Sequence, residues 1–94
     1  METILKFLNV GKGDSIIVNL KKNNESFVAL IDGGEERYSD YVFEELSRVL
    51  NDNNKEGPDL VVCSHYDSDH IGGLIKLTRK FGQKIKLLKP KQIL

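Results

Sequence analysis

Cysteine is scarce in this sequence of 94 residues, where Cys63 is the single example. One thiol cannot form an internal disulfide, and it cannot assemble a tetrahedral thiolate zinc site on its own. The chain must therefore fold without a covalent cross-link, which suits a reducing compartment. No general base can be assigned to Cys63 or Ser64, so we interpret both as strand residues rather than nucleophiles.

Net charge is also lacking, because 14 Lys and Arg residues balance 14 Asp and Glu residues. The whole molecule is therefore not drawn towards a polyanion. The charges are unevenly distributed, however, and residues 76–91 carry a run of Lys and Arg with no acid among them. A solvated basic face is the simpler interpretation of this run, and a nucleic-acid contact surface is the alternative.

Long apolar runs are missing as well. No segment approaches the ~20 residues that a membrane-spanning helix needs, and the first residues lack the basic and then apolar pattern of a signal peptide. We expect a cytoplasmic protein without a membrane partner. The length allows one domain at most, residues 1–94, and 39% hydrophobic with 30% charged residues is an ordinary globular composition.

Three short apolar segments come first along the chain, at residues 4–10, 15–20 and 26–31. Turn residues separate the first two segments, and a polar loop at 21–25 separates the last two. Strands joined this tightly must be antiparallel neighbours, because parallel neighbours need a crossover of a dozen or more residues. The sequence therefore predicts an antiparallel meander.

The apolar period then becomes helical over residues 39–50, where Glu44 and Arg48 are spaced to pair on the outer face. An apolar strand follows at 59–64, then a polar loop at 65–69, a helix from Ile71 to Lys80 and a strand at 84–88. The order β-β-β-α-β-α-β predicts an α/β fold with helices on one face of the sheet. Because several strands are apolar on both sides, the other face needs a cover from further residues, a second copy or a partner chain.

Four potential metal ligands lie within six residues, namely His65, Asp67, Asp69 and His70. Carboxylates this close repel each other unless a cation neutralises them. In an extended segment residues 65, 67 and 69 project to one side. Mixed nitrogen and oxygen ligands suit Zn²⁺ first and Mn²⁺ next. The segment therefore predicts a divalent metal site.

Gly72 and Gly73 follow this segment in the first turn of the expected helix, where each costs about 1 kcal/mol relative to alanine. Close backbone approach explains them, since a helix amino terminus beside a metal favours an anionic group of a substrate. The alternative is that the segment only caps the helix. Capping needs a single side chain from Asp67, Ser68 and Asp69, and it explains neither histidine.

These residues resemble the metallo-β-lactamase-fold hydrolases, whose signature His-x-His-x-Asp-His stands here as residues 65–70. The similarity extends to residues 7–15, 30–34 and 71–74, and it is greatest to the branch typified by the hydrolase domain of the DNA-uptake competence protein ComEC. The resemblance implies the amino-terminal half of an αββα sandwich. It also implies hydrolysis of a phosphodiester or nucleic-acid-like substrate by a metal-activated hydroxide.

The resemblance further implies a role for each ligand in a site of two metal ions. His65 and Asp67 would hold one ion, and Asp69 and His70 the other, with Asp69 also assigned to catalysis. Asp67 departs from the general signature, which has histidine there. Asp14 and Asp32 match family positions that orient a ligand through a hydrogen bond, and each is equally explained as a turn residue.

The remaining ligands of that family lie in later motifs, and both histidines of this chain are already in the segment. We therefore expect an incomplete domain, which needs the missing second half of the fold, a partner chain or a homo-oligomer. Two hypotheses follow. One is a metal-dependent hydrolase that is completed by other residues, and the other is a non-catalytic half-domain that binds a metal or a partner.

Overall fold

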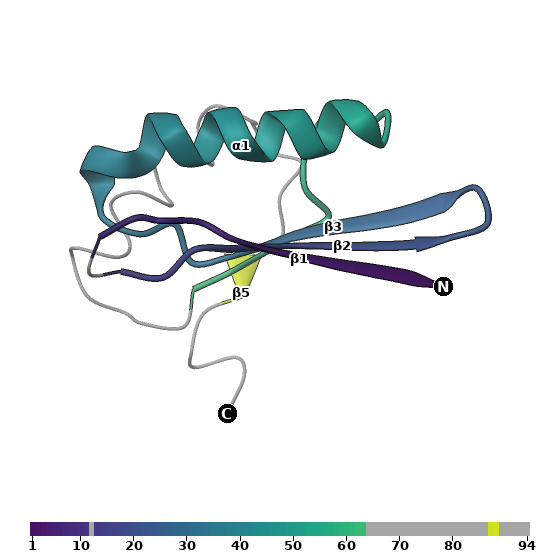
Figure 1. Ribbon diagram of the computed structural model, residues 1–94, viewed down its shortest axis with the longest axis horizontal. Helices are drawn as coiled ribbons and strands as arrows, with labels where there is room; N and C mark the ends of the chain where they lie inside the picture. Colours follow the sequence, from purple (N-terminus) through teal and green to yellow (C-terminus); the bar gives the residue numbers. More distant parts are fainter. Residues whose placement is uncertain (12, 64–86, 89–94) are drawn as a thin grey trace.

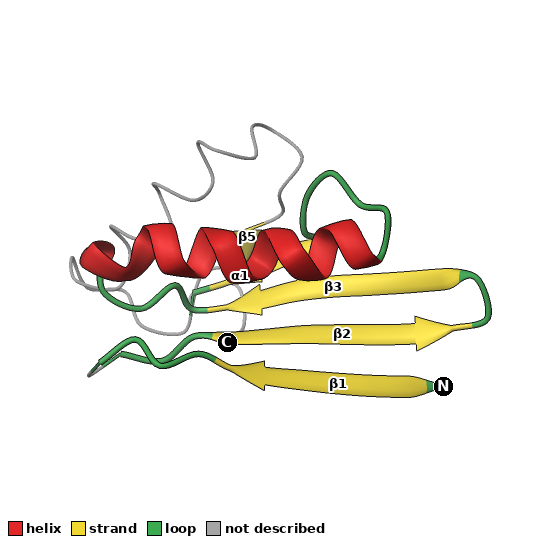
Figure 2. Cartoon of the chain, turned by 45° about the horizontal axis from the view of Figure 1, so that its top comes forward, coloured by secondary structure: helices red, strands yellow, loops and turns green. Residues whose placement is uncertain are grey.

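The computed structural model describes residues 1–11, 13–63 and 87–88. They form a five-stranded sheet in the order β1-β2-β3-β4-β5, and one helix lies along one face of it (Figures 1 and 2). The strands are β1 (Glu2–Phe7), β2 (Ile16–Lys22), β3 (Glu25–Ile31), β4 (Leu60–Val62) and β5 (Leu87–Leu88). A short 3-10 helix, η1 (Glu36–Tyr38), leads into the α-helix α1 (Ser39–Asp52).

The first three strands form the expected antiparallel meander, with Phe7 opposite Ile16 and Ile17 opposite Leu30. The prediction was wrong about the bounds of the first strand, which runs from Glu2 to Phe7 and not from residue 4 to residue 10. The chain leaves the ladder after the Leu8 N–H donates to the Ser15 carbonyl at 2.9 Å. Residues 8–10 still contribute to the core, because Leu8 and Val10 are buried.

The helix α1 crosses from β3 to β4, which makes these two strands parallel neighbours, and β5 is parallel to β4. The sequence placed this helix at 39–50, and the structure extends it to Asp52. The expected pair of Arg48 and Glu44 is present at 2.9 Å. The predicted helix at 71–80 and most of the strand at 84–88 lie outside the described residues.

The core lies between α1 and one face of the sheet. Val42, Leu46 and Leu50 recur every four residues along α1 and belong to one buried cluster with Ile17 and Leu30 of the sheet. A helix stripe of this spacing buries against a flat apolar surface. The structure thus confirms an α/β fold with helix packed on one face, consistent with the amino-terminal part of the sandwich that the resemblance implies.

The opposite face of the sheet, here called the far face, is apolar. Leu5 and Phe7 of β1 point to it, opposite Val18 and Ile16 of β2, because side chains alternate along a strand. Leu5 exposes 52% and Phe7 72% of its surface. Within the described ranges, no helix is long and apolar enough to cross a membrane.

Asp59 fastens the start of β4 to the middle of β3. Its carboxylate accepts a hydrogen bond from the Val28 N–H at 2.8 Å, and its own N–H donates to the Val28 carbonyl at 2.7 Å. Lys55 lies 2.9 Å from the same carboxylate. This clasp sets the register of the parallel pair, and the register determines which residues emerge at the other end of the two strands.

We expect Asp59→Ala to lower the free energy of unfolding by about 2 kcal/mol, because the N–H of the buried residue Val28 loses its acceptor. Urea denaturation followed by circular dichroism measures the loss. Asp52→Ala, an exposed carboxylate on α1, is the control and should change stability by less than about 0.5 kcal/mol. Equal effects of the two substitutions would contradict the clasp.

Candidate metal centre

The carboxyl ends of β3 and β4 meet at one edge of the sheet. Ile31 is in register with Val62, and the Asp32 N–H donates to the Val62 carbonyl at 2.8 Å. Residues that follow parallel strands at this edge converge, which is why open α/β sheets bind ligands there. Asp32 follows β3 directly, and Cys63 follows β4.

Asp32 occupies this edge in a left-handed backbone conformation, with φ 59, and exposes only 3% of its surface. Aspartate is among the residues that tolerate positive φ, so the structure confirms the strand-ending turn. A buried carboxylate needs hydrogen-bond or charge partners to offset its desolvation. The turn therefore also places the buried carboxylate of Asp32 at the carboxyl end of β3. Its role in supporting a metal ligand stays a prediction.

The loop before β2 and the loop after β3 cross in direct contact at the same edge. A Cβ on Gly34 would lie 2.7 Å from the Val10 side chain, and one on Gly13 would lie 3.1 Å from the Gly34 Cα. A Cβ on Gly11 would lie 3.0 Å from the Tyr38 hydroxyl. A Cβ on Gly34 would overlap Val10 and one on Gly13 would crowd Gly34, so glycine at these positions lets the two loops pack directly against each other.

Asp14 lies in the first of these crossing loops and is exposed. The contact between Gly13 and Gly34 therefore brings Asp14 and Asp32 to the same edge, from two different loops. Ser15, beside Asp14, is 2% exposed, and its Oγ has no hydrogen-bond partner in the described part of the chain. The sequence pointed to the two acids but missed the packing of Tyr38 on Gly11. The sequence signal for this contact was weak: an aromatic residue, Tyr38, follows shortly after the pair Gly33 and Gly34.

The four expected ligands, His65, Asp67, Asp69 and His70, lie outside the described residues, so their assignment stays a prediction. In sequence, His65 comes three positions after Val62, the residue whose carbonyl accepts the Asp32 N–H. No group of three His, Cys, Asp or Glu side chains that could hold a metal occurs within residues 1–11, 13–63 and 87–88.

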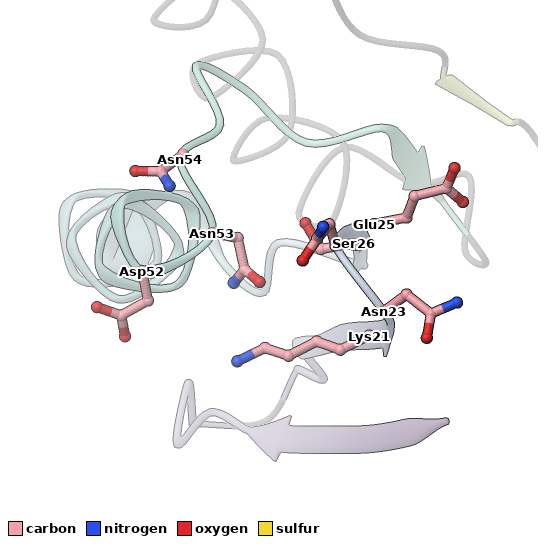
Figure 3. Close-up of a pocket in the computed structure, with 8 residues that line it drawn as sticks. Lys21, Asn23, Glu25, Ser26, Asp52, Asn53 and Asn54 are labelled. Atoms are coloured by element: carbon pink, nitrogen blue, oxygen red, sulfur yellow. The ribbon is translucent and has the colours of Figure 1, made fainter.

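A polar cavity of about 230 Å³ lies at the opposite end of the sheet, between the β2–β3 turn and the carboxyl end of α1 (Figure 3). Asn53 stands at its border and donates to the Asn19 Oδ1 at 3.2 Å and to the Val49 carbonyl at 2.7 Å. These bonds end the helix and tie it to β2. The cavity is remote from Asp32, and its lining is Lys21, Asn23, Asn24, Glu25, Ser26, Asp52, Asn53 and Asn54.

Comparison with known proteins places this arrangement in a family. The profile of the metallo-beta-lactamase superfamily matches residues 8–90. Among solved structures, the crystal structure of a flavoprotein from Thermotoga maritima is similar, with a TM-score of 0.53 and 13% sequence identity. The match covers 93% of this chain and 27% of that chain. At this identity the similarity concerns the fold alone. No curated protein sequence gives a significant match.

Proposed function

Because the chain belongs to the metallo-beta-lactamase superfamily, we propose that it contributes the metal-binding segment of a metal-dependent hydrolase. The observation that carries this proposal is the edge formed by β3 and β4. A buried acid, Asp32, stands there, and the sequence places two imidazoles and two carboxylates directly after β4. That superfamily generally binds metal ions, usually zinc.

The donor set fits a divalent metal. His65 and Asp67 would hold one ion and Asp69 and His70 a second, with Asp69 contributing to catalysis. Asp14 and Asp32 would orient ligands through hydrogen bonds from the two crossing loops. When bound, the metal would supply a water of lowered pKa and stabilise charge on the scissile group. The described residues would contribute the carboxyl ends of β3 and β4 and the two acids Asp14 and Asp32 to such a site.

For the substrate we propose a phosphodiester or nucleic-acid-like molecule. This rests on the resemblance of residues 7–15 and 65–74 to the competence-protein branch. Gly72 and Gly73 favour the same class, since the amino terminus of the helix expected there would offer backbone N–H donors to a phosphate. The basic run at 76–91 adds positive charge close by in sequence.

Metal binding by the unmodified chain tests the proposal at its first step. The protein is loaded with Zn²⁺ or Mn²⁺, dialysed against metal-free buffer and analysed by mass spectrometry for bound metal. We expect at least one ion per chain, and a zinc-dependent rise in the unfolding temperature, because a ligand that binds only the folded state stabilises it. Metal content at background for both ions would refute the proposal.

A non-catalytic half-domain is the second candidate. The observation that favours it is the apolar far face of the sheet, where Leu5 and Phe7 are exposed. Such a module would bind a metal weakly or dock onto a partner without turnover. Hydrolysis of a generic phosphodiester that Asp69→Asn abolishes would exclude this candidate, whereas metal binding without any turnover would favour it.

A further inference from the structure

The strand β1 forms an outer edge of the described sheet and carries an unusual concentration of exposed apolar side chains. Among the described residues, four of the six exposed large hydrophobic residues are Met1, Ile4, Leu5 and Phe7. Their exposed fractions are 87%, 42%, 52% and 72%. An edge strand of this kind presents unpaired backbone groups to another strand. Exposure gathered on one edge, rather than scattered, indicates an interaction surface.

The hydrogen-bond pattern shows which backbone groups β1 offers. The Leu8 N–H donates to the Ser15 carbonyl, and this pair continues the register of Phe7 with Ile16. In an antiparallel pair, bonded and non-bonded positions alternate. The even-numbered residues of β1 therefore bond to β2. The N–H and C=O groups of Thr3, Leu5 and Phe7 point outward from the sheet.

We propose that this edge pairs with β1 of a second copy of the chain, antiparallel and centred on Ile4. The register places Glu2 opposite Lys6 of the second copy, and Lys6 opposite its Glu2. It also places Thr3 opposite Leu5 of the second copy, so the outward backbone groups of both strands meet as bonded pairs. The two sheets join into one, and both apolar faces continue across the two-fold axis.

Charge singles out this register. Moving the second strand by two residues keeps the hydrogen-bond pattern, but it places Ile4 of the second copy opposite either Lys6 or Glu2. A lysine on an edge strand ordinarily guards against such pairing. Here Lys6 is held by Glu45 of its own chain at 3.5 Å and remains 41% exposed at its side chain, while Glu2 has no ion pair within the described ranges. In the proposed register Glu2 of the second copy lies opposite Lys6. The lysine therefore favours this register instead of preventing pairing.

The apolar residues gain most from the pairing. Ile4 meets its symmetry mate across the axis on the helix face, and Leu5 and Phe7 extend the far face. Cross-strand pairs of apolar or opposite charge each stabilise a sheet by roughly 0.2–1 kcal/mol. The inference concerns β1 alone and does not depend on the proposed metal site.

Charge reversal on the full chain tests this inference by sedimentation equilibrium. We expect a concentration-dependent dimer, and we expect Glu2→Lys and Lys6→Glu each to raise its dissociation constant about tenfold or more, since like charges then face each other twice. Glu25→Lys, the same change at the exposed first residue of β3, should leave it unaltered. Circular dichroism checks that each variant is folded.

Mixing separates this interface from any other. Glu2→Lys and Lys6→Glu are complementary in the proposed register, so an equimolar mixture should regain the wild-type dissociation constant. The double variant alone should also regain the wild-type dissociation constant. This result would show that the loss in the single variants does not come from misfolding. A monomer at all concentrations overturns the proposal, as does a dimer that ignores both reversals or single variants that mixing does not rescue.

Discussion

Gly34→Ala is expected to lower the free energy of unfolding by about 3 kcal/mol or more, a large share of the stability of a chain this small. Two costs add. Gly34 has φ +70, where an L-residue with a Cβ is strained by about 1–2 kcal/mol. The new Cβ would also lie 2.7 Å from Val10, which is 1% exposed and cannot move aside. Overpacking of this kind typically costs about 1–3 kcal/mol.

Urea denaturation measures the loss of unfolding free energy, and two further variants show where the loss comes from. Asn24→Ala changes an exposed turn residue and should shift stability by less than about 0.5 kcal/mol. Removing the Val10 γ-methyl groups in Val10→Ala relieves part of the clash. The double variant should therefore lose less than the sum of the single losses. Strict additivity would mean that backbone strain, and not the crossing of the two loops, accounts for the effect.

If Asp69 is a ligand as proposed, Asp69→Asn is expected to weaken metal affinity about 100-fold or more, because the substitution removes the charge of that ligand. Loss of residues that merely support a ligand already costs about 10- to 100-fold. A competition titration with a chromogenic chelator measures the affinity. The zinc-dependent rise in unfolding temperature should disappear in the variant while the metal-free protein stays folded.

Asp52→Asn is the matched control, since it neutralises an exposed carboxylate at the far end of α1 and should leave metal affinity unchanged. The capping interpretation of residues 67–69 makes a different prediction. If these side chains only cap a helix, Asp69→Asn costs about 1 kcal/mol of stability and zinc stabilises neither protein. That result would refute both the proposed metal site and the proposed hydrolase function.

Local periodicity was sufficient to find α1 and the strands that the structure describes, because each of them carries a run or a stripe of apolar residues. Helix α1 was located to within two residues of its end, since Val42, Leu46 and Leu50 repeat at the helical period. The first strand was placed too late. Leu8 and Val10 are as apolar as strand residues, but the chain leaves the ladder after Leu8, and Val10 buries its side chain from the loop before Gly11. Apolar composition reports burial and not hydrogen bonding.

Residue types and spacing alone determine the α/β class, the antiparallel start and the candidate ligands at 65–70. Each of these follows from short-range pattern and ligand chemistry. The tertiary structure alone decided that Asp32 is buried beside the end of β4, that the loop containing Asp14 crosses Gly34, and that β1 is an outer strand of the described sheet. These features depend on register and on contacts between distant segments. No local pattern carries that information, because a shift of one residue reverses every face.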